Sequence, residues 1–244
     1  ELSIFGRVDG GSLVTPIEWG TTPGGRAYVI RPWIEGRPFD QAIVGRSLDE
    51  IVGWTRSLLE ALAHLHEAGL VHRDVKAANV VVGSDGVHLV DFDLVAEAGQ
   101  DSEGAGSPLH MAPEVLLGQP FGPAGDLFSL GVMLALALCC RADDGFHQRF
   151  PARSFWVASG LDATRLDPRL APLVQALVRR HVHERPATAR AALRLLEGGA
   201  SRISDVRLPF LAGRLGSLRR LSERIGSGQG EVLAIAVTDL EEQG

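Results

Sequence analysis

The chain has 244 residues, a formal net charge of −6 and a hydrophobic content of 45%. This length and composition suit one large or two small folded domains and exclude wholesale disorder. The negative charge argues against a protein whose main task is to coat nucleic acid, so no nucleic-acid partner is expected.

Cysteine content and hydropathy indicate the compartment. The two cysteines, Cys139 and Cys140, are adjacent and cannot form a disulfide framework, which fits a reducing compartment. No run of about 18 apolar residues occurs, so no membrane span is expected. The chain begins at Glu1 without a basic and apolar leader, so no signal peptide is visible. These features predict a cytoplasmic location.

The first elements in chain order are two predicted strands, 12–19 and 26–34, joined by a glycine-rich turn. Ser47 and Glu50 then form a capping box, with a hydroxyl at the N-cap and a carboxylate three residues later. The predicted helix behind it carries apolar residues at helical spacing and ends at Gly69.

Further along, short apolar strands at 80–82 and 87–90 flank a Gly-Ser-Asp-Gly turn and predict a β-hairpin. The strongly apolar run 126–140 is too short for a bilayer and predicts a helix buried on all sides. Two amphipathic helices are predicted near 172–182 and 187–197.

The segment 72–93 carries the side chains that phosphoryl transfer needs. A divalent metal must bridge the phosphates, and Asn79 and Asp91 can supply oxygen ligands from opposite ends of the predicted hairpin. Asp74 can receive or orient an attacking hydroxyl group, and Lys76 adds a positive charge near the transferred phosphate. A hairpin holds these groups at fixed separation.

Five ordered motifs resemble those of eukaryotic-like protein kinases, of the kind found in bacteria. In this sequence they are HRDVKAAN (72–79), DFD (91–93), GSPLHMAPE (106–114), GDLFSLGVML (125–134) and HERPATA (183–189). The resemblance covers roughly residues 1–199. It implies an α+β, two-lobe protein kinase-like fold, mostly the helical C-lobe with the hinge and the last strands of the N-lobe.

The resemblance also implies roles for the residues of the first two motifs. Asp74 is then the catalytic base, and Lys76 stabilises the transferred phosphate. Asn79 and Asp91 are the implied ligands of Mg²⁺, which accompanies ATP. A lysine two positions after the base resembles Ser/Thr kinases rather than tyrosine kinases, so ATP and a protein substrate are the expected partners.

Arg73 is implied to pair with a phosphate on the activation loop, which makes Ser102 or Ser107 the candidate switch. Ser107 also matches the family residue that contacts the catalytic loop. Glu114 and Arg185 are implied to form a buried ion pair. Asp126, at the start of the apolar run, is implied to brace the backbone of the catalytic loop.

The strand at 26–34 resembles the one that leads into the adenine-binding hinge of kinases. Alignment places the hinge carbonyl and N–H groups at Pro32 and Ile34, and Val81 belongs to the same implied nucleotide site. Proline can serve at its position because only its carbonyl is needed. Arg31 falls where the family has an apolar side chain, and a guanidinium there must find an acceptor or reach solvent.

Two departures from the family bear on activity. Asp93 replaces the glycine of the DFG motif, which restricts the backbone conformations of that loop. Glu1 aligns with the glutamate of helix C, and Lys76 is the only lysine, so the glycine-rich loop and strand lysine have no counterpart. The expectation is an N-terminally truncated domain, inactive or nearly so alone, with an N-lobe remnant at 1–36 and a C-lobe at 37–199.

Residues 200–244 are predicted to be a linker and the beginning of a second domain. This tail resembles the entry to AAA-type signalling ATPases fused after bacterial kinases, with a strand at 232–237 leading to a loop that resembles a P-loop. Asp239 stands in place of that loop's first glycine, so nucleotide binding by the tail is not expected. Of the 24 basic residues, 23 are arginine, which suits a GC-rich bacterial genome.

Three alternatives to an active kinase stay open. A pseudokinase scaffold that regulates a fused ATPase is favoured by Arg31 and Asp93. A small-molecule phosphotransferase of the aminoglycoside-kinase type has a similar catalytic loop, although the motifs at 106–114 and 183–189 argue against it. A metal hydrolase is the most distant. Two His-x-His pairs are interpreted as ordinary surface or half-buried histidines on different helix faces rather than metal ligands: His64 with His66, and His181 with His183.

Overall fold

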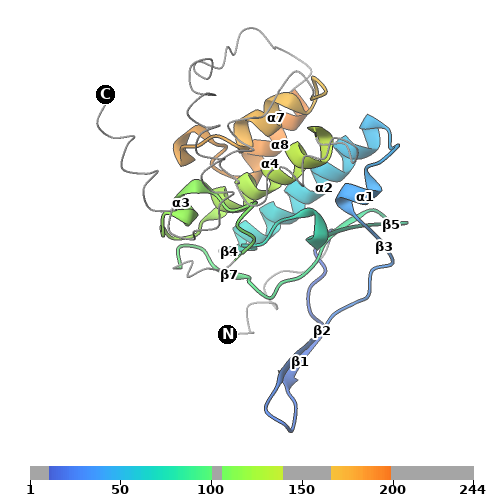
Figure 1. Ribbon diagram of the computed structural model, residues 1–244, viewed down its shortest axis with the longest axis vertical. Helices are drawn as coiled ribbons and strands as arrows, with labels where there is room; N and C mark the ends of the chain where they lie inside the picture. Colours follow the sequence, from blue (N-terminus) through green and yellow to red (C-terminus); the bar gives the residue numbers. More distant parts are fainter. Residues whose placement is uncertain (1–10, 101–105, 140–165, 199–244) are drawn as a thin grey trace, which may run out of the picture. The chain divides into compact units, whose positions relative to one another are not determined.

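Packed helices form most of the core. The computed structural model describes three stretches of the chain, residues 11–100, 106–139 and 166–198. Helix α2 (Leu48–Glu67) packs against α8 (Ala189–Gly198), and α4 (Pro123–Cys139) packs against α7 (Ala171–Leu177). Helix α7 also contacts α8, so these helices lie together, as Figure 1 shows.

Helix α2 begins and ends where the sequence predicts. The Ser47 hydroxyl accepts a hydrogen bond from the Glu50 N–H at 3.3 Å, and the Glu50 carboxylate accepts one from the Ser47 N–H at 2.9 Å. The reciprocal pair satisfies two N–H groups that a helix N-terminus otherwise leaves free. At the other end Gly69 has a φ of +79°, a left-handed conformation that glycine adopts without strain.

Helix α4 is the predicted helix buried on all sides, and it begins three residues earlier than predicted, at Pro123. Proline suits the first helical turn because its missing N–H would have no partner there. The buried Ser129 hydroxyl donates to the carbonyls of Gly125 (3.0 Å) and His110 (2.8 Å), so its polar group is satisfied. Among the helices of the described stretches, none is long and apolar enough to cross a membrane.

The strands form small antiparallel sheets. In sheet order they are β1 (Glu18–Thr21) with β2 (Ala27–Ile30), β3 (Gly36–Pro38) with β5 (Val80–Gly83) and β6 (Val87–Leu89), and β4 (Leu70–Val71) with β7 (Ala96–Glu97). The predicted hairpin at 80–90 is β5 and β6. Short helices α1 (Phe39–Ala42) and α3 (Pro113–Leu116) complete the described elements, with 3₁₀ turns at Ala77–Asn79 and Val182–Glu184. Helices beside small antiparallel sheets confirm the predicted α+β class.

The first predicted strand, 12–19, is wrong over most of its length. Only its last residues pair with β2, while Ser12–Val14 run beside β6 instead. The Val14 N–H donates to the Leu89 carbonyl at 3.0 Å, and the Leu89 N–H donates to the Ser12 carbonyl at 2.6 Å. Leu13 and Val14 are apolar because they are buried against this hairpin, which the local pattern alone cannot show.

The helix predicted at 172–182 ends early, at Leu177. Beyond it the carbonyls of Arg179 and Arg180 accept hydrogen bonds from the Arg185 guanidinium, and His181 is extended, with φ −89° and ψ 130°. The prediction that His181 and His183 lie on different faces of a helix is therefore wrong. Their rings stack, with centroids 5.6 Å apart and an interplanar angle of 22°.

Two glycines in helices offer a matched test of this packing. At Gly131 of α4 an added Cβ would lie 2.6 Å from the Leu177 Cβ, whereas at Gly53 of α2 it would meet nothing within 4 Å. We expect Gly131→Ala to lower the free energy of unfolding by about 1–3 kcal/mol. Gly53→Ala should raise it by up to about 1 kcal/mol, because alanine loses less entropy in a helix. Urea denaturation measures both, and equal effects would contradict the close approach of α4 and α7.

Candidate active site

The Asp74 carboxylate is the centre of a closed hydrogen-bond network. Lys76 Nζ donates to Asp74 Oδ2 at 2.6 Å and to Ser107 Oγ at 2.9 Å, while Ser107 Oγ donates to Asp74 Oδ1 at 2.8 Å. Asn79 Nδ2 donates to both the carboxylate and the carbonyl of Asp74, each at 2.9 Å. The structure thus brings together four residues that the sequence predicted for one site.

These contacts fix the charge of Asp74. Burial by itself raises the pKa of the Asp74 carboxyl, but the hydrogen bonds from Lys76 and Ser107, the lysine charge and the Asn79 amide together hold it below the ordinary value. The carboxyl group is therefore ionised at neutral pH. An ionised carboxylate beside an ammonium group can accept a proton or orient a hydroxyl donor.

The loop that carries Asp74 is held by the buried carboxylate of Asp126. Its oxygens accept hydrogen bonds from the N–H groups of His72 and Arg73, each at 2.8 Å. Arg73 has a φ of +69°, a conformation that is strained for residues other than glycine. The predicted brace is confirmed. Sequence reasoning missed His66, whose Nε2 lies 2.9 Å from Asp126 Oδ2, because nothing local distinguishes it from a surface histidine.

Gly106 allows the segment that carries Ser107 to approach the Asp74 loop. Its φ is +113°, and a Cβ at this position would lie 2.6 Å from the Arg73 carbonyl oxygen. Any side chain there would push the two segments apart and break the contact between Ser107 and Asp74. The Gly-Ser pair therefore acts as a unit: the glycine permits the approach and the serine makes the bond.

Asp91 follows strand β6 and comes directly after Val90, which is hydrogen-bonded to Asn79. The Val90 N–H donates to the Asn79 carbonyl at 2.9 Å. Both hydrogen bonds of the Asn79 amide nitrogen go to Asp74, so its Oδ1 points away from that carboxylate. An amide oxygen and a carboxylate are donors that fit Mg²⁺, which takes its other ligands from water and phosphate. Within the described stretches, no group of three or more His, Cys, Asp or Glu side chains could hold a metal ion.

A buried histidine packs against the segment that carries Asp91. His72 is fully buried, and its ring packs against Phe92 with the centroids 5.3 Å apart. Burial lowers the pKa of His72, although the carboxylates of Asp126, Asp74 and Asp91 act against this. The imidazole thus serves as a neutral packing element between the Asp74 loop and the segment that carries Asp91.

The predicted nucleotide-binding residues lie on neighbouring segments. Pro38 of β3 pairs with Val81 of β5, which brings the chain after Ile34 onto the hairpin. Pro32 is exposed and Ile34 is half-buried. Arg31 is exposed, so of the two predicted possibilities its side chain reaches solvent. A cavity of about 500 Å³ near this segment is lined by other residues, among them Glu35, Arg37, Arg46 and Ser84.

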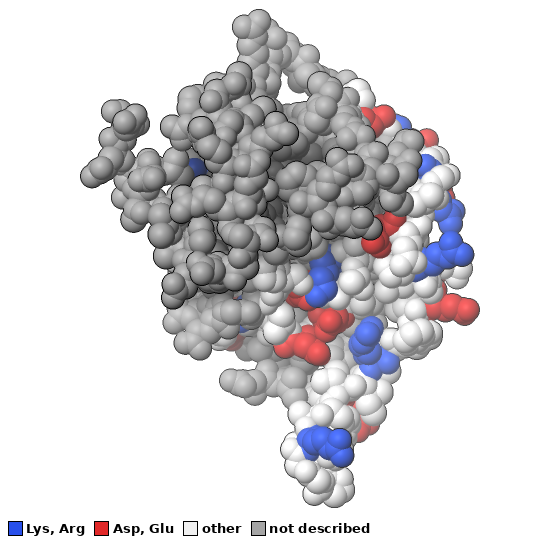
Figure 2. Space-filling model, viewed as in Figure 1, with Lys and Arg blue, Asp and Glu red and all other residues white. Residues whose placement is uncertain are grey.

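Two of the predicted site residues, Glu1 and Ser102, lie outside the described stretches. The Arg73 guanidinium lies 6.0 Å from the centre of the Phe121 ring. The pairing of Arg73 with a phosphate on the activation loop stays a prediction. Figure 2 shows basic and acidic side chains interspersed over the described part of one face of the molecule.

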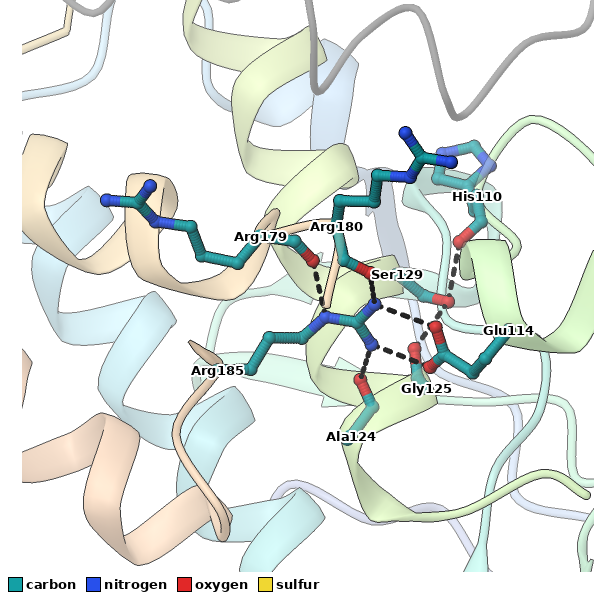
Figure 3. Close-up of polar contacts among 8 residues, drawn as sticks. All are labelled: His110, Glu114, Ala124, Gly125, Ser129, Arg179, Arg180 and Arg185. Carbon is teal, nitrogen blue, oxygen red and sulfur yellow. Dashed lines mark hydrogen bonds and ion pairs between the residues drawn. The ribbon is translucent and has the colours of Figure 1, made fainter. Parts of the chain in front are cut away.

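The predicted ion pair between Glu114 and Arg185 is confirmed and buried. Both guanidinium NH groups donate to the two carboxylate oxygens at 2.7 Å, and the ring of Phe128 lies 4.7 Å from the guanidinium carbon. Figure 3 shows that the remaining donors of Arg185 point to backbone carbonyls, those of Ala124, Arg179 and Arg180. One side chain thereby joins the start of α3, the start of α4 and the segment after α7.

The sequence comparisons identify the family to which this site belongs. Residues 1–154 match the protein kinase domain family. The chain therefore belongs to that family, and the kinase-like fold expected from the motifs is confirmed.

Serine/threonine-protein kinases are among the similar proteins. One is the probable serine/threonine-protein kinase mkcF of Dictyostelium discoideum, 33% identical over 149 residues, which are 59% of this chain and 22% of that protein. Another is serine/threonine-protein kinase PAK 1 of Mus musculus, 35% identical over 117 residues, which are 45% of this chain and 22% of that protein. The matched segment thus spans less than a quarter of the length of these relatives.

Removing the buried guanidinium tests the ion pair. Arg185→Ala leaves the Glu114 carboxylate buried without its partner, so we expect the free energy of unfolding to fall by about 3–5 kcal/mol. Arg190→Ala is the matched control, because its ion pair with Glu67 is solvent-exposed and should contribute little. Urea denaturation of both variants gives the comparison. A similar small loss in both would show that Arg185 does not join these elements.

The lowered pKa of Asp74 predicts a pH-dependent contribution to stability. A carboxyl group with a depressed folded-state pKa stabilises the fold at pH values above its unfolded pKa, near 3.8 for aspartate. That contribution is lost as the pH falls through the lower folded-state value. The unfolding free energy of the wild type, measured relative to that of Asp74→Asn, should therefore be lower at pH 3 than at pH 7. A difference that is constant with pH would refute the assignment.

Proposed function

We infer that this chain is the greater part of a Ser/Thr protein kinase domain that transfers the γ-phosphate of ATP to hydroxyl groups of a protein substrate. The observation that carries this proposal is the Asp74 carboxylate held by Lys76, Ser107 and Asn79. The lysine that bridges the carboxylate and a serine supports the Ser/Thr class, as do the names of the relatives.

Each residue of the site has a proposed task. Asp74 accepts or orients the proton of the attacking hydroxyl group, and Lys76 places a positive charge beside the transferred phosphate. Asn79 and Asp91 supply oxygen ligands for Mg²⁺, which neutralises phosphate charge when bound. The adenine ring is bound by a further set of groups, namely the Pro32 carbonyl, the Ile34 N–H and the Val81 side chain.

Regulation by phosphorylation is proposed at the loop that follows Asp91. Arg73 is the residue that would pair with the added phosphate. Ser107 already donates to Asp74, and a phosphate there would place negative charge against the catalytic carboxylate. Ser102 is therefore the better candidate for an activating site.

The remaining assignments concern the whole protein. We propose a kinase domain over residues 1–199, with Glu1 as the helix C glutamate, and a linker and ATPase-like second domain beginning in 200–244. A glycine-rich loop and a strand lysine would have to come from outside this sequence, so the chain by itself is expected to transfer phosphate poorly. A bacterial, cytoplasmic signalling protein is the setting that the composition favours.

A pseudokinase scaffold is the second candidate. Asp93 supports it, because this residue replaces the glycine that gives the DFG loop its conformational freedom. The intact network around Asp74 argues for catalysis instead.

Transfer of radiolabelled γ-phosphate tests the proposal on the full-length protein that contains this chain, with Mg²⁺ and ATP. Asp74→Asn should reduce labelling by at least about 100-fold, because the substituted amide is a far weaker proton acceptor. Asp85→Asn is the matched control, since its carboxylate is exposed at the turn between β5 and β6 and should leave labelling unchanged.

Equal labelling of wild type and Asp74→Asn would refute the role of Asp74. A folded full-length protein without label in any form would favour the scaffold, and a binding measurement with ATP would then show whether the nucleotide site survives.

A further inference from the structure

The buried carboxylate of Asp126 has a further partner, which comes from helix α2. His66 lies in the last turn of α2, and its Nε2 is 2.9 Å from Asp126 Oδ2. A carboxylate only accepts hydrogen bonds, so the hydrogen of this contact belongs to the imidazole. The His66 side chain is 7% exposed and that of Asp126 is fully buried, so the bond is shielded from water, which strengthens it.

His66 shares its acceptor with the loop that carries Asp74. Asp126 Oδ2 also accepts the His72 N–H at 2.8 Å, and Oδ1 accepts the Arg73 N–H at the same distance. The terminal torsion of a carboxylate is soft, so the donors around it set the orientation of its plane. A donor from outside the loop therefore helps to fix which oxygen faces each loop N–H.

Helix α2 holds the imidazole in a fixed place. Leu62 and Leu65, in the same part of the helix, are fully buried in the core, and α2 packs against α8. Asp126 in turn belongs to the first turn of the buried helix α4. Because packed helices do not shift without disturbing the core, both the donor and its acceptor are fixed relative to the loop.

Packing alone does not explain a histidine at this position. The second ring nitrogen of His66, Nδ1, is buried and has no hydrogen-bond partner among the described residues. A buried polar atom without a partner lowers stability, so an apolar side chain of similar size would suit a purely structural role better. The hydrogen bond from Nε2 to Asp126 offsets this cost, which indicates that the position requires this bond.

We propose that His66 is a positioning residue for phosphate transfer, which acts through Asp126 on the loop that carries Asp74. Its hydrogen bond keeps the carboxylate turned toward the N–H groups of His72 and Arg73. These N–H groups in turn place Asp74, the next residue, where it meets the attacking hydroxyl group, and small displacements of such a group lower a rate strongly. The catalytic part of this role rests on the proposed kinase function, whereas the holding of the loop does not.

Hydrogen–deuterium exchange tests the holding of the loop in the full-length protein that contains this chain, without ATP. His66→Leu removes the donor and keeps a side chain of similar size, so we expect the amides in 70–76 to exchange faster by about tenfold or more. His66→Gln should keep exchange slow, because its Nε2 amide group can still donate to Asp126.

Two controls accompany the exchange measurement. His64→Leu places the same substitution on an exposed histidine of the same helix, so exchange in 70–76 should not change. A peptide from 130–138 in α4 should exchange at the wild-type rate in each variant, which separates a local effect from a general loss of stability. His66→Asn, whose shorter side chain does not reach Asp126, replaces the leucine variant where that variant does not fold.

The kinetics of phosphate transfer test the catalytic part, with casein as the substrate and saturating Mg²⁺. His66→Leu should lower kcat by about tenfold or more and leave the KM for ATP within about twofold, because the proposed adenine-binding groups belong to other segments. His66→Gln should recover most of kcat, and His64→Leu should match the wild type. A merely structural role would not give this division between kcat and KM or this rescue by a donor.

The proposal is overturned by unchanged exchange of 70–76 in His66→Leu, by equal effects of His64→Leu, or by a glutamine variant that behaves as the leucine variant does. An equal acceleration of exchange in 130–138 would also overturn it, because the effect would then be general. A wild type that transfers no phosphate while 70–76 responds as expected would refute the proposed function and the catalytic part, and the holding of the loop would stand.

Discussion

Two backbone N–H groups of the loop that carries Asp74 donate hydrogen bonds to one buried carboxylate, that of Asp126. This contact joins the first turn of α4 to residues 72–73 and holds Arg73 in a left-handed conformation. Because the buried helix α4 cannot shift without disturbing the core, the loop that is hydrogen-bonded to it is held rigidly as well. The network of Asp74, Lys76 and Ser107 is built on this fixed backbone, and catalysis by positioning depends on such rigidity.

Arg185 plays a comparable part, and it too contacts the first turn of α4, at the Ala124 carbonyl. Its guanidinium satisfies the Glu114 carboxylate together with three backbone carbonyls, so the charge is fully compensated although it is buried. A single residue thus joins α3, the start of α4 and the segment after α7.

The sequence by itself determined the elements that depend on local chemistry: the capping box of Ser47 and Glu50, the buried α4 and the β5–β6 hairpin. Ordered motifs also predicted the residues that meet around Asp74. Only the tertiary structure decided where segments distant in sequence approach one another. It placed His66 on Asp126, moved Leu13 beside β6 and ended α7 at Leu177. These outcomes depend on partners many residues away, and hydrophobic periodicity and capping signals carry no information about such partners.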